Sequence, residues 1–316
     1  MEKKTKINVL VTGGSGLLAG RINEFLKYKQ INSKLLSRYP KIKKKNYDFI
    51  FTDWKFNNLK KKIKDFDVII HCAGLNANEC HNQPKLANKI NYVNSKKILD
   101  ISIKSKVKLF IFISTVHVYK SPLLGNFDEN TKTKNDHPYA KSKRKFEKYL
   151  IKKSKGSKLK GLVVRLSNSF GRPINKSSNC WSLLINDLCK NIHKTNSIIL
   201  QSSVNSVRDF VPITSLNVFL YDMIKRLIID NVNINYSIVN FSSGESKTIY
   251  SLAKKISSIY KSISKKTAII KKKFSKLQSK EICNIKSIRI NLKNYQSREL
   301  FNNEISDLLK FCDKNF

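Results

Sequence analysis

Short apolar runs alternate with amphipathic stretches through the first half of the chain. Residues 7–11 read INVLV, a continuous run rich in β-branched side chains, which is typical of a strand buried on both faces of a parallel sheet. Similar runs predict further strands at residues 34–37, 47–51, 67–72, 107–114 and 161–166. Helical periodicity between most of these runs predicts helices at residues 17–29, 57–64, 84–104 and 138–155. This alternation predicts an α/β fold with a doubly wound parallel sheet.

A glycine-rich turn follows the first predicted strand directly. Gly13, Gly14 and Gly16 allow a sharp turn and let a pyrophosphate approach the backbone, while the helix predicted at residues 17–29 presents its N-terminus to that anion. A strand, a glycine turn and a helix in this order form the context that the dinucleotide-binding motif requires. The turn therefore predicts a Rossmann domain that binds NAD or NADP. The expected cofactor contacts in the turn are Gly13, Ser15, Gly16 and Leu17.

The alternation becomes irregular after the Gly-Arg-Pro sequence at residues 171–173. The pattern there predicts helices near residues 181–193, 215–230, 248–263 and 303–315, and short strands near residues 198–201, 236–241 and 267–272. A smaller mixed region that covers the substrate fits this stretch. We therefore expect a dinucleotide-binding domain over residues 1–171 and a mainly substrate-binding region over residues 172–316, with some of its segments returning to the first sheet.

The end of the second predicted strand bears on the choice of dinucleotide. In NAD-binding folds a carboxylate about 20 residues beyond the glycines holds the ribose 2′-hydroxyl. Here the chain reads Leu36-Ser37-Arg38, which offers no carboxylate, and the Arg38 guanidinium could pair with a 2′-phosphate. NADP is therefore favoured over NAD as the cofactor. The alternative is that Arg38 is an ordinary surface arginine beside the basic run at residues 41–45.

Three further side chains form a candidate centre for proton transfer. Tyr139 and Lys143 are four residues apart on a predicted helix, so they share one face, and the ammonium can favour the ionised phenol. Thr115 follows a buried strand at the edge where doubly wound folds place ligands, and its hydroxyl could bind the substrate's reacting oxygen.

His117 is a fourth candidate for the same centre. Period-2 alternation places its side chain on the same side as Thr115, where an imidazole could transfer a further proton near neutral pH. The alternative is a histidine that is satisfied by local packing after the strand has ended.

Composition adds a strong positive charge. The formal net charge is +40 at pH 7, which raises nucleic acid as a partner because basic surfaces attract polyanions. However, 53 of the 62 cationic residues are lysines, and they are spread through every predicted helix and loop. Phosphate-reading surfaces favour arginine forks and clustered patches, and the two modest clusters at residues 41–45 and 271–273 are expected to be solvated. Nucleic acid is therefore not expected as a partner.

The cysteines and the apolar runs indicate whether the sequence predicts a metal site, a signal peptide or a membrane span. The six cysteines show neither a C-x-x-C pair nor the Cys/His spacing of a zinc site, so no metal is expected and a reducing cytoplasm fits best. The apolar stretch near the N-terminus is interrupted by glycines and continues into an amphipathic helix, unlike a signal peptide. No apolar run approaches the length of a membrane span, so a membrane is not expected as a partner.

Ordered motifs through nearly the whole chain resemble the extended short-chain dehydrogenase/reductases, the NAD-dependent epimerase/dehydratase family. The glycine turn, Ser114-Thr115 and Tyr139-x-x-x-Lys143 carry the resemblance in the first half. It implies that hydride passes between nicotinamide C4 and a sugar carbon, while Tyr139 exchanges the proton on oxygen. It also implies that Lys143 lowers the pKa of Tyr139 and holds the nicotinamide ribose, and that Thr115 orients the same oxygen.

Two shorter segments of the first half extend the resemblance to the cofactor. The sequence Asp53-Trp54 resembles the family's acidic residue that meets the adenine. The sequence His71-Cys72-Ala73-Gly74 resembles the family's segment that passes beside the cofactor. The resemblance therefore implies further cofactor contacts at Asp53, Trp54, Ala73 and Gly74.

Two segments of the second half resemble substrate-binding motifs of the family. Asn168 lies in a stretch similar to R-x-x-N-x-[YF]-G-P, which is found near the nicotinamide and the substrate. The sequence Arg208-Asp209-Phe210-Val211 is similar to R-D-[FY]-[VI], whose arginine commonly meets a nucleotide diphosphate. The implied substrate is a nucleotide-activated sugar. Many relatives also pair through helices corresponding to residues 84–104 and 138–155, so a homodimer is a further expectation.

Departures from the family narrow the reaction. The 4,6-dehydratases carry an Asp-Glu pair directly after the catalytic threonine, and this chain has Val116 and His117 there, so dehydration is disfavoured. We expect an NADP-dependent 4-keto reductase of a nucleotide sugar, acting in surface-polysaccharide biosynthesis. The alternatives are a nucleotide-sugar 4-epimerase with bound NAD, an enzyme of a neutral ketone, and a non-enzymatic member that senses NADP(H) or binds RNA.

Overall fold

The computed structural model describes residues 7–38, 47–201, 205–272 and 282–316. The described chain divides into two compact units. The first unit comprises Met1–Ser121, Lys132–Leu166 and Asn217–Val239, and the second comprises Pro122–Thr131, Ser167–Leu216 and Asn240–Phe316. Each unit is thus assembled from three segments of the chain. The basic run at residues 41–45 and the last residue of the run at 271–273 lie outside the described residues.

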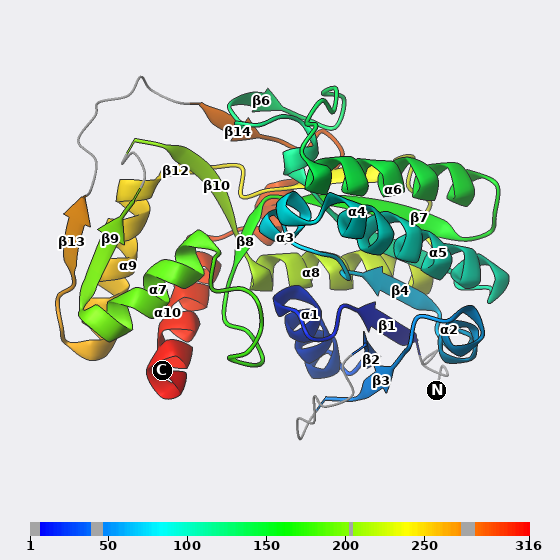
Figure 1. Ribbon diagram of the computed structural model, residues 1–316, viewed down its shortest axis with the longest axis horizontal. Coiled ribbons are helices and arrows are strands. Elements are labelled where there is room, and N and C mark those ends of the chain that lie inside the picture. The colour runs from blue at the N-terminus through cyan, green and yellow to red at the C-terminus, as the bar shows by residue number, and fades with distance from the viewer. Residues whose placement is uncertain (1–6, 39–46, 202–204, 273–281) are drawn as a thin grey trace. The chain divides into compact units, whose positions relative to one another are not determined.

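A seven-stranded sheet forms the centre of the first unit (Figure 1). Its order is β11-β7-β5-β4-β1-β2-β3, and every pairing from β7 to β3 is parallel. The strands are β1 (Asn8–Thr12), β2 (Asn32–Ser37), β3 (Phe49–Phe51), β4 (Val68–His71), β5 (Leu109–Thr115), β7 (Lys160–Leu166) and β11 (Ile238–Phe241). The order reverses between β1 and β4, which confirms the predicted doubly wound Rossmann sheet. The last strand, β11, comes from the C-terminal half of the chain.

Helices flank this sheet. They are α1 (Leu17–Tyr28), α2 (Phe56–Ile63), α3 (Ala77–Asn82), α4 (Pro84–Ala87), α5 (Ser95–Lys104), α6 (Pro138–Lys155) and α8 (Ile213–Ile224). The cores of α5 and α6, with Ile98 and Phe146 among them, pack on strand residues such as Phe110 and Phe112, and the two helices lie side by side (Figure 1). Among the described residues, every helix is too short or too polar to cross a bilayer.

The helix predicted at residues 84–104 is interrupted. A π-helical segment, η1 (Asn88–Asn94), separates α4 from α5, and a second one, η3 (Lys225–Ile229), follows α8. Asn91 lies in η1 with its side chain buried, and its Oδ1 accepts a hydrogen bond from the Leu75 amide outside the helix. Sequence periodicity alone could not reveal the π-helical segment.

The second unit is mixed, as predicted. Its helices are α7 (Leu184–Thr195), α9 (Ile249–Ser264) and α10 (Arg298–Asn315), with a 3₁₀ turn, η4 (Leu292–Tyr295). A three-stranded sheet has the order β12-β10-β8, and two strand pairs are β13-β9 and β14-β6. These strands are β6 (Gly125–Phe127), β8 (Asn168–Phe170), β9 (Ser197–Leu200), β10 (Val207–Pro212), β12 (Ser246–Thr248), β13 (Ile269–Lys272) and β14 (Cys283–Ile285). Side chains of α7, α9 and α10 form its core with Phe170 and Phe210.

Candidate active site

The glycine turn lies at the carboxyl end of β1. The amides of Gly13 and Gly14 donate to the carbonyl oxygen of Leu36 at 3.1 and 3.0 Å, and the amide of Gly16 donates to Gly13 O at 2.8 Å. Gly13 has φ +82°, and a Cβ there would lie 2.9 Å from the amide nitrogen of Ala73. Only glycine fits this position without displacing the neighbouring backbone.

The helix that follows the turn begins without a side-chain cap. Gly16 is the N-cap of α1, and no described side chain caps it. Amides of the first turn are therefore free of a competing side-chain acceptor, which suits the binding of an anion. Ser15 is partly exposed in the turn, whereas Leu17 is buried at the start of the helix.

A buried chain of hydrogen bonds joins the residue before the glycine turn to the end of β4 and the start of α5. Thr12 Oγ1 lies 2.7 Å from His71 Nδ1, and His71 Nε2 lies 2.8 Å from Ser95 Oγ. Because Ser95 donates to the carbonyl oxygen of Asn91, it accepts from His71 Nε2–H, and Thr12 then donates to Nδ1. The Ala73 amide completes the chain by donating to Thr12 Oγ1 at 3.2 Å. Burial lowers the pKa of His71 to about 3, so the ring is neutral at physiological pH.

Residues after β2 and β3 lie along the same edge of the sheet as the turn, because these strands are parallel and in register. Arg38 is exposed directly after β2. Asp53 is exposed after β3 and accepts a hydrogen bond from the Lys55 amide at 2.9 Å. Trp54 adopts φ +63°, and its indole packs against the core of the sheet.

Thr115, Tyr139 and Lys143 converge at the carboxyl end of β5. Thr115 is the last residue of that strand, and its side chain hydrogen-bonds the Tyr139 phenol. Lys143 follows one turn later on α6, with its Nζ 5.8 Å from the centre of the Tyr139 ring. Nζ also donates to the carbonyl oxygen of Ile113 at 3.0 Å. The three side chains named from the sequence therefore share one place in the first unit.

Burial dominates the electrostatics of this centre. It raises the pKa of Tyr139 to about 12, with the Cys80 thiol adding to the rise and the hydrogen bond from Thr115 opposing it. Burial also lowers the pKa of Lys143 to about 8. The net effect of these surroundings on the pKa of Tyr139 is upward, and the lowering of that pKa by Lys143 stays a prediction. The phenol keeps its proton at neutral pH.

The loop after β4 passes directly over Lys143. A Cβ on Gly74 would lie 3.0 Å from Asn91 Oδ1 and 3.6 Å from Lys143 Nζ. Asn91 fastens this loop, because its Oδ1 accepts from the Leu75 amide at 2.7 Å and its Nδ2 donates to Ser142 Oγ at 3.2 Å. Asn91 was not predicted as a site residue, because polar side chains are common on an amphipathic helix and only its burial distinguishes it from them.

The strand alternation invoked for His117 is wrong. The strand ends at Thr115, and η2 (Val116–Val118) is a 3₁₀ turn, so period 2 does not extend to His117. The Thr115 hydroxyl caps this turn by accepting from the His117 amide at 3.2 Å. His117 is partly exposed, and Asn135 Nδ2 donates to its carbonyl oxygen at 2.7 Å.

Asn168 and Arg208 both belong to the β8–β10–β12 sheet of the second unit. Asn168 Nδ2 donates to the carbonyl oxygen of Asp209 at 2.9 Å. The Asp209 carboxylate accepts from the Ser243 amide at 3.0 Å, and burial raises the pKa of Asp209. Arg208 is exposed and pairs directly across the antiparallel ladder with Lys247, so the two side chains project from the same face.

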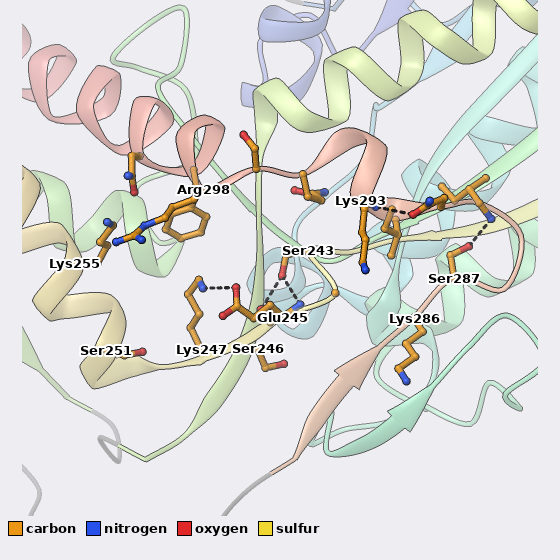
Figure 2. Close-up of a pocket in the computed structure, with 18 of the residues that line it drawn as sticks. Ser243, Glu245, Ser246, Lys247, Ser251, Lys255, Lys286, Ser287, Lys293 and Arg298 are labelled. Carbon is orange, nitrogen blue, oxygen red and sulfur yellow. Dashed lines mark hydrogen bonds and ion pairs between the residues drawn. The ribbon is translucent and has the colours of Figure 1, made fainter.

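Next to Lys247, the second unit contains a cavity of about 1150 Å³ (Figure 2). Its described cationic lining consists of Lys247, Lys255, Lys286, Lys293 and Arg298. Figure 2 shows Lys247, Lys255 and Arg298 on one side of the cavity, from β12, α9 and the start of α10. Lys247 Nζ pairs with the Glu245 carboxylate at 2.8 Å, whereas the other four cations have no carboxylate partner among the described residues. The cavity favours an anionic ligand.

A comparison with models of protein families identifies the family of this chain. Residues 9–226 match the model of the NAD dependent epimerase/dehydratase family. The chain belongs to this family. The match covers the glycine turn, the Thr115–Tyr139–Lys143 centre and Arg208.

Members of the family with different activities resemble the chain. It is 28% identical to the ADP-L-glycero-D-manno-heptose-6-epimerase of Brachyspira hyodysenteriae over 290 residues, which cover 81% of this chain and 82% of that one. It is 28% identical to the human dTDP-D-glucose 4,6-dehydratase over 183 residues, 52% of this chain and 51% of that one. The UDP-glucose 4-epimerase of Thermotoga maritima, solved with UDP-glucose, superposes with a TM-score of 0.78 at 18% identity over 98% of this chain and 99% of that one. Solved structures with this fold include complexes with NAD and with NADPH.

The glycine turn fits the dinucleotide of the family. Gly13 packs closely on the Ala73 backbone, and the uncapped start of α1 beside it offers backbone amides to an anion such as a pyrophosphate.

Proposed function

We propose that the protein is an NAD(P)-dependent enzyme that acts at C4 of a nucleotide-activated sugar, and that it reduces a 4-keto sugar. The observation that carries the proposal is the convergence of Thr115, Tyr139 and Lys143 in the same unit as the glycine turn. A hydroxyl, a phenol and an ammonium at one strand end can bind a carbonyl oxygen and protonate it.

The proton chemistry follows from the charge states of these residues. Bound NAD(P)H would supply the hydride to the sugar carbon. Tyr139, with a pKa of about 12, holds its proton at neutral pH and would pass it to the oxygen, so that the carbonyl becomes an alcohol. Thr115 would hold that oxygen in place, and the Lys143 ammonium would compensate the phenolate that remains. A protonated phenol suits reduction better than oxidation.

The substrate proposal rests on the cations of the second unit. Arg208 and Lys247 would contact the diphosphate of the nucleotide, and the neighbouring cations would strengthen the attraction. The epimerases of Brachyspira hyodysenteriae and Thermotoga maritima are named for ADP- and UDP-linked sugars, which supports this substrate class. The division of labour, with cofactor on the first 171 residues and substrate mainly on the rest, is part of the proposal.

NADP is the proposed cofactor because Arg38 stands where an NAD-binding carboxylate would be. The second candidate function is a nucleotide-sugar epimerase with bound NAD, and two similar epimerases favour it. Dehydration is the weakest option, since Val116 and His117 replace the acidic pair that it uses. A non-enzymatic role would not require Thr115, Tyr139 and Lys143 to stay together.

The test is a screen of nucleotide sugars and their 4-keto forms against purified protein. Loss of NADPH absorbance together with a mass gain of two hydrogens in a 4-keto substrate would establish reduction. Conversion between two isomers without net NADPH use would establish epimerisation instead. Salt-sensitive RNA binding without any turnover would reject both enzymatic proposals.

A further inference from the structure

A buried carboxylate lies behind the end of β5. Glu147 on α6 is 2% exposed, and Arg165 on β7 is 5% exposed. The guanidinium contacts the carboxylate through two nitrogens, with Nη2 at 2.8 Å and Nε at 3.2 Å from Oε2. Such a paired, bidentate contact is the arrangement that a buried charge requires.

The same ion pair holds both ends of the segment that carries Thr115. At one end Ser114 Oγ donates to Glu147 Oε1, and Ser114 is also the register partner of Arg165 between β5 and β7. At the other end Arg165 Nη1 donates to the phenol oxygen of Tyr119 at 3.1 Å. Residues 114–119 therefore begin and end on one buried pair.

Glu147 also stands in line with the catalytic side chains on its own helix. Tyr139, Lys143 and Glu147 are spaced four residues apart on α6, so they lie along one face. The helix thus presents a phenol, an ammonium and a carboxylate to the end of β5. The carboxylate binds the strand, while the other two groups approach Thr115.

We propose that Glu147 is a positioning residue of the active centre, which fixes residues 114–119, and with them Thr115, against the helix that carries Tyr139 and Lys143. The inference rests on the proposed function because it concerns the same centre. It adds a residue that does not touch the substrate but acts through Ser114 and Arg165.

Charge gives Glu147 a second effect on the same centre. The groups that face Lys143 are His71 and Cys72 at the end of β4, Cys80 on α3, and Tyr139 and Glu147 on α6. His71 is neutral, and burial raises the pKa of Cys72 to about 12 and raises that of Cys80. Glu147 is the carboxylate among these described groups, and it opposes the desolvation that lowers the pKa of Lys143. Its removal should lower that pKa further.

The test compares Glu147→Gln with the full-length protein. We expect kcat to fall on the order of 10²-fold, as displacement of a reacting group by about 1 Å can cause, with NADPH binding retained. We also expect the alkaline limb of the kcat profile, where Lys143 loses its proton, to move to lower pH. A merely structural residue would not move this limb.

Two further variants keep the test decisive. Glu147→Gln leaves Arg165 unpaired, so the double variant Glu147→Gln/Arg165→Met removes the buried charge as well and should fold. The matched control is Glu304→Gln, since Glu304 is also 2% exposed and accepts from Thr214 N at 3.1 Å in the second unit. We expect the control to lower thermal stability without shifting the limb. A wild-type kcat in the folded double variant would overturn the inference.

A readout without substrate separates this inference from the proposed function. Competitive acylation followed by mass spectrometry can follow the Lys143 peptide across pH. We expect its midpoint to be lower in Glu147→Gln and closer to the wild-type value in the double variant, which also loses the positive charge of Arg165. A lowered midpoint in a protein that reduces no sugar would support the role of Glu147 and reject the reductase. An unchanged midpoint in Glu147→Gln would overturn the electrostatic effect of Glu147 on Lys143 whatever the substrate.

Discussion

Lys143 Nζ donates a hydrogen bond to the carbonyl oxygen of Ile113 at 3.0 Å, two residues before the end of β5. The ammonium is thereby fixed to the strand rather than to the phenol. It lies close enough to the Tyr139 ring to stabilise a phenolate once the proton has left, but it does not remove that proton beforehand. This arrangement supports the proposal that Tyr139 donates a proton.

Replacing Tyr139 by Phe should remove this donor. We expect kcat to fall about 10²- to 10⁴-fold, the usual contribution of general acid catalysis, because the ring remains but its proton is lost. NADPH binding, followed by fluorescence titration, should stay close to wild type. Unchanged turnover in this variant would exclude Tyr139 as the proton donor.

Replacing Arg208 by Ala should weaken substrate binding. A charge-assisted hydrogen bond contributes about 1.5–3 kcal/mol, so we expect KM for a nucleotide sugar to rise about 10- to 100-fold with kcat little changed. The exposed Arg289 provides a matched control in the same unit, and Arg289→Ala should leave KM unaltered. If Arg208→Ala and Arg289→Ala have the same KM for the nucleotide sugar, Arg208 does not contact the diphosphate.

Replacing Arg38 by Gln tests the cofactor. If the guanidinium binds a 2′-phosphate, KM for NADPH should rise about 10-fold or more while KM for NADH stays constant. Steady-state kinetics with both cofactors measure the ratio directly. Equal effects on the two cofactors would mean that Arg38 does not read the 2′-phosphate.

Replacing His117 by Gln distinguishes the two leading reactions. A reductase that protonates through Tyr139 should keep most of its activity, since the 3₁₀ turn that holds His117 depends on backbone groups and Thr115. An epimerase that uses the imidazole should lose the incorporation of solvent deuterium into the sugar. Mass spectrometry of the product in D₂O separates these outcomes.

His71 should make the free energy of unfolding depend on pH. Its folded pKa of about 3 lies below the ordinary value of 6.5, so the unfolded state binds the extra proton between these values. Stability should therefore rise with pH from about 3 to 6.5, with a slope from this residue of up to about 1.4 kcal/mol per pH unit. Urea titrations at several pH values should show a smaller slope for His71→Gln than for His81→Gln, whose side chain is exposed. Equal slopes for the two variants would contradict a lowered pKa of His71 in the folded protein.

The periodic parts of the fold could be predicted from the sequence. Long apolar runs such as the one that becomes β5 bury both faces, and their alternation with helices specifies a parallel sheet. The strands β6, β8, β12 and β14 were missed because each has three residues, which is too short for a period to appear. The longer β10 was also missed, since its polar residues Arg208 and Asp209 interrupt the apolar pattern.

The site was predictable only where motifs specify geometry. Helical spacing brought Tyr139 and Lys143 together, and the end of β5 supplied Thr115. The strand argument for His117 was wrong because a 3₁₀ turn ended the strand two residues earlier than alternation required. Glu147 was missed because a glutamate on a lysine-rich helix has the appearance of a solvated residue, and only its pairing with buried Arg165 reveals its position.

The cavity in Figure 2 has a consequence for how the protein should be assayed. Among the described residues, four of its cations have no carboxylate partner, and mobile ions screen such a field over about 8 Å at physiological ionic strength. Apparent affinity for a doubly charged ligand in this cavity would then fall as the salt concentration of the buffer rises. Rates measured in dilute buffer would overstate the capture of substrate under cellular salt.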